Sequence, residues 1–181
     1  GGLCALGTDA TAIWQSMREG RAGIGPITTL NLRELKVSHG AEIKALPAHD
    51  IDPKRLATMD RFSLLAVLAA RESLRQSGLD LGSIDRNRGG AVIGTGIFGA
   101  GSVDDTYRAI LTEGKTRAPI LTVPRIMPGA PAGQVSMNFG LRGPVFGVTS
   151  ACASANHAFA SACDQLRLGR ADVMLAGASD A

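Results

Sequence analysis

The sequence predicts an α/β fold in which helices pack closely on a parallel β-sheet. Near the end of the chain, a strand over 144–149, a helix over 154–168 and a strand over 172–177 follow one another. A strand–helix–strand unit implies parallel strands joined by a right-handed crossover. Aromatic residues make up only 4% of the chain whereas it contains 23 glycines, and such small residues let helix and sheet backbones approach.

The first part of the chain predicts a short capped helix and one strand. Thr8 or Asp9 can cap a helix that runs to Arg18, because both side chains accept hydrogen bonds from a first helical turn. Gly20 ends this helix, since glycine readily adopts the left-handed conformation found at helix ends. A polar stretch with Gly and Pro follows, and within it we expect an edge strand over 36–43.

A long helix and several shorter elements come next. The segment 60–76 is apolar on most faces, which predicts a buried helix, and Gly78 ends it. The middle of the chain then predicts a buried strand over 90–94, a glycine-rich turn over 94–101, a helix over 102–113, a basic loop over 115–125, and a helix over 129–139 that Gly140 ends.

The composition argues against several classes of function. A length of 181 residues fits one domain or part of a larger one, and a net charge of +3 does not require a nucleic acid partner. No apolar run reaches the roughly 18–20 residues that a membrane-spanning helix needs. Because the sequence lacks a first methionine and ends directly after an apolar strand-like run, we expect it to be truncated at both ends.

The cysteines and histidines show no metal-binding pattern. Cys4, Cys152 and Cys163 form no CxxC pair, and the three histidines lack ligand spacing, so we expect no metal site and no cofactor. An odd number of cysteines without a signal peptide favours a reducing, cytoplasmic setting.

Cys152 is the strongest candidate for a catalytic residue. It falls between a predicted strand and the start of a predicted helix, where the unpaired N–H groups of the helix favour a thiolate. The same N–H groups can stabilise an oxyanion that develops on a thioester carbonyl. The flanking residues are small, which leaves room for a substrate, and nucleophiles at strand-to-helix turns recur in acyl-transfer enzymes.

The helix after Cys152 has one apolar face that we expect to pack on the sheet. Its members lie at helical spacing and are Ala155, Ala158, Phe159, Ala162, Cys163 and Leu166. Cys163 is therefore expected to be a core residue. His157 lies on the opposite face, so we interpret it as a packed or hydrogen-bonded histidine and not as a base for Cys152.

Several motifs resemble a known family. The segments Gly140-Leu-Arg-Gly-Pro144, Thr149-Ser-Ala-Cys-Ala-Ser154, Gly169-Arg-Ala-Asp172 and Leu175-Ala-Gly177 resemble the active-site block of the β-ketoacyl-acyl carrier protein synthases. Supporting matches are Leu3-Cys-Ala-Leu-Gly7, Met59-Asp60-Arg-Phe62, Gly94-Thr-Gly96 and Val123-Pro124. The chain is most similar to the discrete elongating enzymes of type II fatty acid synthesis and to their nodulation or polyketide relatives. It departs from them in having Ser150 where Thr is frequent, and Ser179-Asp180 where Gly-Glu is frequent.

The resemblance implies a thiolase-like αβαβα layered fold, of which residues 1–181 form the N-terminal half. In this family the cysteine that Cys152 matches takes an acyl chain from acyl carrier protein, and decarboxylation of malonyl-acyl carrier protein supplies the carbanion that attacks the thioester. The two histidines and the lysine that assist belong to the other half, and no histidine of this chain matches them. A homodimer is also implied, with acyl carrier protein and acyl and malonyl thioesters as partners. From the mild net charge and the lack of a long apolar run, we expect no nucleic acid partner and no membrane association.

The same resemblance suggests further site residues. The region after Gly94-Thr-Gly96 approaches the acyl pocket in the family, which makes Val103 a candidate substrate-binding residue. Lys115 and Arg117 match a carrier-protein docking region in position, with an ordinary solvated surface as the alternative. The glycines over 94–99 also fit the dinucleotide pattern GxGxxG, but the acidic residue expected about twenty positions later is missing, so we interpret them as a tight, closely packed turn.

Three alternative functions stay open. The ketosynthase domains of modular polyketide synthases usually carry Asp-Pro-Gln-Gln-Arg and Cys-Ser-Ser, whereas this chain has Leu56-Ala-Thr-Met-Asp60 and Cys152-Ala-Ser154. A non-catalytic partner subunit resembling a chain-length factor would lack the nucleophile. The third alternative is a folded but catalytically incomplete scaffold, and we expect the 181 residues alone not to complete a condensation.

Overall fold

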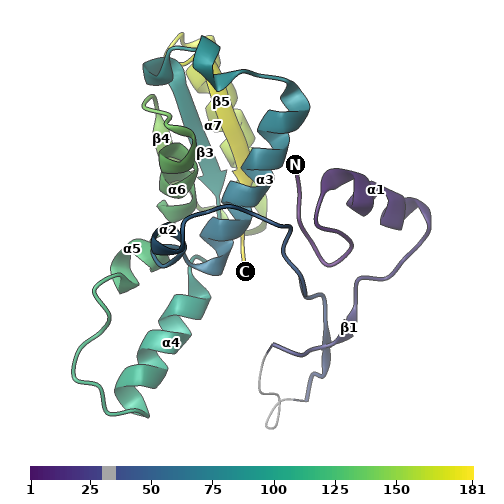
Figure 1. Ribbon diagram of the computed structural model, residues 1–181, viewed down its shortest axis with the longest axis vertical. Helices are drawn as coiled ribbons and strands as arrows, with labels where there is room; N and C mark the ends of the chain where they lie inside the picture. The colour runs from purple at the N-terminus through teal and green to yellow at the C-terminus, as the bar shows by residue number, and fades with distance from the viewer. Residues whose placement is uncertain (30–35) are drawn as a thin grey trace.

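The computed structural model describes residues 1–29 and 36–181, and its centre is a parallel sheet. The strand order is β4–β3–β5, with bounds β3 (Gly89–Gly94), β4 (Val145–Val148) and β5 (Val173–Ala178). Figure 1 shows the three strands side by side with helices around them. In the register of the sheet, Val92 of β3 pairs with Phe146 of β4 and with Ala176 of β5. The predicted α/β class and parallel strands are confirmed.

The central strand β3 separates the two strands of the predicted strand–helix–strand unit. β4 and β5 both pair with β3, so the chain between them crosses over β3 through the helix α7 (Ser154–Arg167). All six residues of β3 are buried. A central strand covered on both faces needs no polar alternation, which explains its uniformly small and apolar sequence.

One face of the sheet is covered by the helices α3 (Arg61–Ser77) and α6 (Ala130–Phe139). Val67 of α3 and Val135 of α6 are fully buried in the core that these helices form with the sheet. Gly78 and Gly140 follow the two helices in the left-handed conformation, with φ of +66° and +68°. Both helices and both stops agree with the sequence prediction.

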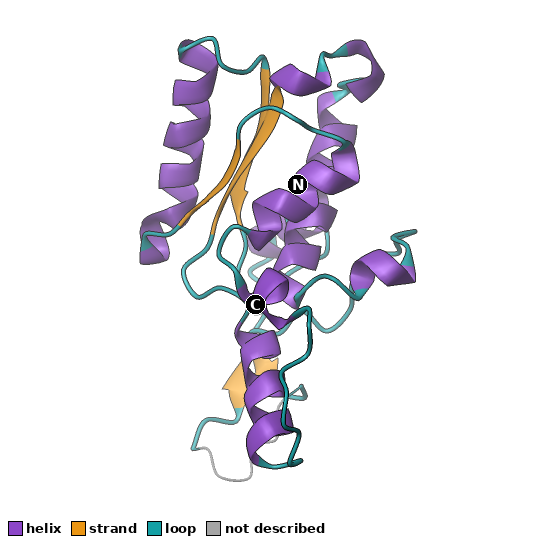
Figure 2. Cartoon of the chain, turned by 90° about the vertical axis from the view of Figure 1, so that its left-hand side faces the viewer, coloured by secondary structure: helices purple, strands orange, loops and turns teal. Residues whose placement is uncertain are grey.

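The other face of the sheet is covered by α7. Ala158 and Ala162 are buried and pack around Val92 of β3. Figure 2 views the strands with helices on both sides, which is the layered arrangement expected of this fold class. Small side chains on α7 allow this close approach to the sheet.

The buried face of α7 is narrower than predicted. Phe159 and Leu166 are 52% and 40% exposed, and Cys163 is also exposed. The buried stripe follows i, i+4 spacing through Ser154, Ala158 and Ala162, and a helix turns by about 100° per residue. Phe159 and Cys163 each follow a buried residue directly, so they lie on the flank, and the prediction that Cys163 is a core residue is wrong.

The helices α4 (Ala100–Leu111) and α5 (Thr122–Ile126) form an arm that extends away from the sheet (Figure 1). α4 begins and ends two residues earlier than predicted, and α5 overlaps the end of the predicted basic loop. The buried carboxylate of Asp60 joins this arm to the body. It accepts hydrogen bonds from the backbone N–H of Phe62 at 3.4 Å and of Ser102 at 2.7 Å, and so caps α3 and α4 together.

The N-terminal segment lies to the side of α3. Its elements are α1 (Ala10–Arg18), β1 (Gly25–Pro26) and β2 (His39–Gly40), and Asp9 caps α1 as predicted. Only two residues of the strand expected over 36–43 form a strand. The buried Glu72 of α3 accepts hydrogen bonds from the N–H groups of Gly2 and Ala10, both at 2.8 Å, and so holds the segment against the core.

Three further short elements lie between β2 and β3. They are α2 (Pro53–Leu56), η1 (Leu81–Ser83) and η2 (Arg86–Arg88). Within residues 1–29 and 36–181, no helix combines the length and the apolar character needed to cross a bilayer.

Candidate active site

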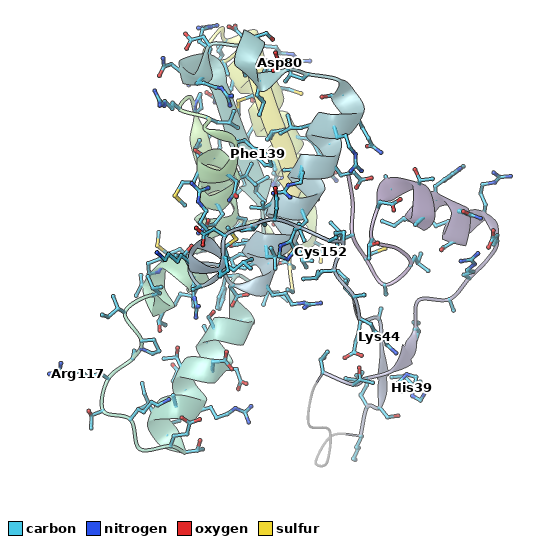
Figure 3. The ribbon with its side chains drawn as sticks, viewed as in Figure 1. His39, Lys44, Asp80, Arg117, Phe139 and Cys152 are labelled. Carbon is cyan, nitrogen blue, oxygen red and sulfur yellow. The ribbon has the colours of Figure 1, made fainter. Side chains whose placement is uncertain are left out.

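Cys152 lies in a tight turn between β4 and α7, as the sequence predicts. A single 3-10 turn, η3 (Ala151–Ala153), joins the end of the strand to the helix, and Cys152 is exposed within it. Ala151 has a φ of +51°, a left-handed conformation that is unfavourable for a residue with a Cβ. We call residues 150–154 the elbow, because the chain turns sharply here and presents the Cys152 thiol at the carboxyl edge of the sheet (Figure 3).

The N-terminus of α7 points its backbone dipole toward the elbow. The helix is 14 residues long, and its N-cap residue, Ala153, supplies no side-chain hydrogen bond to the first turn. Such an end carries partial positive charge, and the N–H groups of Ala153 and Ser154 donate to the carbonyl oxygens of Ser150 and Ala151 within the elbow. The arrangement suits a thiolate nucleophile and a tetrahedral oxyanion formed next to it.

Hydrogen bonds from polar side chains stabilise the turn of the elbow. The hydroxyl of Ser154 accepts a hydrogen bond from the N–H of Ser150 at 2.9 Å and is 2.7 Å from the carbonyl oxygen of Ala151. Nδ1 of His157 lies 2.6 Å from the hydroxyl of Ser150. His157 is thus hydrogen-bonded, as predicted, and its contact is with Ser150.

A second turn, over residues 95–98 at the end of β3, supports the elbow. A Cβ added to Gly94 would lie 2.5 Å from the carbonyl oxygen of Ser154, and one added to Gly99 would lie 2.7 Å from that of Arg125. These glycines therefore serve close backbone packing, and this interpretation of the GxGxxG pattern is confirmed. The carboxylate of Asp180 accepts hydrogen bonds from the N–H groups of Gly96 and Ile97, so the amides that a phosphate would need already have an anionic partner.

The other predicted site residues lie on the α4–α5 arm. Val103 is partly buried in the first turn of α4. Lys115 and Arg117 are exposed in the loop that follows, and Lys115 pairs with Glu113 at 2.9 Å. Figure 3 shows Arg117 at the outer edge of the arm, away from Cys152. The structure therefore places the docking candidates apart from the thiol.

Hydrogen bonds lower the pKa of the carboxyl groups of Asp172 and Glu42. The pKa of Asp172 lies below its ordinary value, chiefly because Arg88 donates hydrogen bonds to its carboxylate, and this pair joins the starts of β3 and β5. Hydrogen bonds from Thr29 and Thr28 lower the pKa of Glu42 to about 2 in the N-terminal segment. Among the residues that the structure describes, no cluster of three or more His, Cys, Asp or Glu side chains could hold a metal ion.

Sequence reasoning did not identify Thr95 and Asp180 as site residues. They lie 85 positions apart, and the hydroxyl of Thr95 donates a 2.5 Å hydrogen bond to the carboxylate of Asp180. The available signal was their position, because both come just after strands of a parallel sheet. Carboxyl ends of parallel strands meet at one edge, where polar residues can form a site.

The fold and the elbow define a thiolase-like α/β protein with an exposed cysteine at a strand-to-helix turn. The structure is similar to that of the ishigamide ketosynthase/chain length factor, with a TM-score of 0.87, 24% identity, and coverage of 100% of this chain and 46% of that one. It is also similar to the ketosynthase of a type II polyketide synthase solved with its acyl-carrier protein, with a TM-score of 0.76, 23% identity, and coverage of 100% and 48%.

The chain belongs to the β-ketoacyl synthase family, because the family profile described as "Beta-ketoacyl synthase, N-terminal domain" matches residues 1–181. It is 64% identical to Nodulation protein E of Rhizobium sp. (strain N33) and 31% identical to 3-oxoacyl-acyl-carrier-protein synthase 2 of Staphylococcus aureus. Both matches cover 100% of this chain, which spans 45% of the length of each relative.

Proposed function

We propose that this chain is the N-terminal half of a β-ketoacyl-acyl carrier protein synthase, a condensing acyltransferase. The observation that carries the proposal is the exposed Cys152 at the elbow, between β4 and the N-terminus of α7, in a chain of the β-ketoacyl synthase family. A nucleophile held there is accessible to a large thioester and lies at the positive end of a helix dipole, which stabilises an oxyanion.

The first half-reaction transfers an acyl chain to the enzyme. The Cys152 thiolate attacks the carbonyl carbon of an acyl-carrier thioester, and the positive end of the α7 dipole stabilises the tetrahedral oxyanion. Collapse of this intermediate releases the carrier thiolate, which takes up a proton, and leaves a thioester on Cys152. The resulting route is a ping-pong mechanism.

The second half-reaction makes the carbon–carbon bond. Malonyl-carrier protein loses carbon dioxide, and the carbanion that forms attacks the acyl–Cys152 thioester and releases the thiolate. By resemblance, two histidines and a lysine outside residues 1–181 assist these steps. The Nδ1 atom of His157 is already engaged with Ser150, which supports assigning no such role to His157.

Acyl carrier protein and a second copy of the enzyme are the proposed partners. Lys115 and Arg117 are exposed and cationic, which suits an acidic carrier, and a related ketosynthase was solved with its acyl-carrier protein. Within the described residues, β4 pairs only with β3, so its other edge is open to strand pairing in a homodimer. Apolar side chains on the α4–α5 arm, including Leu111 and Ile120, are exposed, which favours an interface with another protein chain on this surface.

Fatty acid synthesis and a specialised nodulation pathway are the two candidate settings. The identity of 64% to Nodulation protein E, against 31% to 3-oxoacyl-acyl-carrier-protein synthase 2, favours the nodulation pathway. Three free cysteines are compatible with a reducing compartment, and we propose the cytoplasm as the location. Rescue of a strain that lacks its elongating condensing enzyme would support fatty acid synthesis. Failure of rescue by a demonstrably active enzyme would support the specialised pathway.

A condensation assay tests the proposed activity. The full-length enzyme is incubated with acyl- and malonyl-carrier protein, and the β-ketoacyl product is measured by mass spectrometry. We expect product from the wild type and from Cys163→Ala, whose thiol is also exposed, and none from Cys152→Ala. Product formation by a folded Cys152→Ala variant would contradict the proposed mechanism. We expect no complete condensation by residues 1–181 alone.

A further inference from the structure

Asp180 makes a concentrated set of hydrogen bonds at the carboxyl edge of the sheet. Its carboxylate accepts hydrogen bonds from the Thr95 hydroxyl at 2.5 Å and from the N–H groups of Gly96 and Ile97, both at 3.0 Å. Hydrogen bonds to a charged acceptor are about twice as strong as those between neutral groups. One side chain after β5 thereby fixes the turn over 95–98 after β3.

The residue before Asp180 determines where this carboxylate points. Ser179 is buried, and its N–H donates to the carbonyl oxygen of Gly94 at 2.9 Å, which continues the sheet beyond β5. Its hydroxyl donates to the carbonyl oxygen of Phe62 in α3 at 2.7 Å. The backbone next to Asp180 is therefore fixed to β3 and to α3 through Ser179.

The turn that Asp180 fixes is in contact with the elbow. The carbonyl oxygen of Thr95 lies 3.0 Å from the Ser154 hydroxyl. The same hydroxyl accepts a hydrogen bond from the N–H of Ser150. A Cβ added to Gly96 would lie 3.5 Å from the backbone of Ala151, so the turn packs directly against the residue before Cys152. Because Ala151 is left-handed, with a φ of +51°, its conformation requires support from its surroundings.

We propose that Asp180 is a positioning residue for Cys152, acting through the turn over 95–98 and Ser154. The carboxylate holds the turn, the turn contacts Ala151 and Ser154, and these two residues hold the elbow in the geometry that presents the thiol. Asp180 does not touch the reacting atoms in this account. The inference rests on the proposed function, since the elbow matters for catalysis only if Cys152 is the nucleophile.

Acylation kinetics of the full-length enzyme test the proposal. Asp180→Ala should lower kcat for acylation of Cys152 by about tenfold or more and leave KM within about threefold, because a misplaced nucleophile slows chemistry more than binding. Asp180→Glu keeps the carboxylate and should recover at least half of the lost rate. The matched control is Asp164→Ala, which removes an exposed carboxylate from α7 and should leave the rate unchanged.

Amide hydrogen exchange separates the positioning inference from the proposed function. In Asp180→Ala, exchange should become faster at Gly96 and Ile97 and also at Ser150 and Ala153 of the elbow. Faster exchange at the turn alone, with wild-type acylation, would overturn the proposal, because the turn would then not support the elbow. If the wild type forms no acyl-enzyme, the proposed function fails, and exchange at the elbow still decides whether Asp180 holds it.

Discussion

Nδ1 of His157 lies 2.6 Å from the hydroxyl oxygen of Ser150, and this contact connects α7 to the first residue of the elbow that carries Cys152. Ser150 follows the end of β4 and His157 lies in the first turns of α7, so the contact joins the strand and the helix across the turn. A histidine near a cysteine invites interpretation as a catalytic base. The structure indicates a different role, because its Nδ1 atom contacts the side-chain hydroxyl of Ser150, a residue of the turn that carries the thiol.

Removing the Ser150–His157 contact should slow acylation moderately. His157→Ala and Ser150→Ala should each lower the acylation rate about three- to tenfold, the cost of one hydrogen bond that holds the elbow. The double variant should lose little more than either single one, since both remove the same contact. Ser150→Thr keeps the hydroxyl and serves as the control. Additive losses, measured as acylation rates in a double-mutant cycle, would show that the two residues act independently.

Gly94 should not tolerate a side chain, whereas Gly133 should. Gly94→Ala would place a Cβ 2.5 Å from the backbone of Ser154 and displace the start of α7, lowering acylation about tenfold or more. Gly133 lies in α6, and a Cβ added there would meet no atom within 4 Å, so Gly133→Ala should keep activity and raise the free energy of unfolding by up to about 1 kcal/mol. Thermal unfolding and acylation rates of both variants measure this contrast. Equal effects of the two substitutions would contradict the packing account.

Asp60 should contribute far more to the free energy of unfolding than Asp52, which also caps a helix. Asp60→Ala removes one buried carboxylate that caps two helices, so the free energy of unfolding should fall by about 2–4 kcal/mol. Asp52→Ala removes an exposed cap of the short α2 and should cost only about 0.5–1 kcal/mol. Denaturant unfolding of both variants gives the comparison. Similar losses would show that Asp60 does not bridge α3 and α4 in solution.

Glu42 should titrate well below an ordinary carboxyl group. Its pKa is lowered from 4.5 to about 2, mainly by the Thr29 hydroxyl and also by the N–H groups of Thr28 and Thr29. A depressed folded-state pKa means that its stabilising effect is present above pH 4.5 and is lost as the pH falls toward 2. NMR titration of the carboxyl carbon measures the value directly, with Glu42→Gln as the control for acid-induced opening of this segment. A value near 4.5 would contradict the hydrogen bonds described.

Local sequence signals predicted the local structure well. The cap at Asp9 and the glycine stops after α3 and α6 were predictable, because each depends on residues a few positions apart. Cys152 at a strand-to-helix turn was predictable for the same reason. The width of the buried face of α7 was overestimated at Cys163, since helical periodicity gives the direction of a face and not the area that the sheet covers.

Contacts between particular residues of distant segments were not predictable from the sequence, although the positions of Thr95 and Asp180 after parallel strands place both at one edge of the sheet. Nothing local indicates that β3 separates β4 from β5, because strand order depends on the whole chain. The contact of Thr95 with Asp180 and that of Asp60 with Ser102 span 85 and 42 positions, and both organise the surroundings of the elbow or the arm. Such contacts become visible only when the fold brings the strand and helix ends together.

Intact-protein mass spectrometry after incubation with an acyl-carrier protein thioester shows whether Cys152 accepts the acyl chain. We expect the full-length wild type and Cys163→Ala each to gain the mass of one acyl group, and Cys152→Ala to gain none. A mass gain in a folded Cys152→Ala variant, or none in a folded wild type, would show that Cys152 is not the acyl-accepting nucleophile.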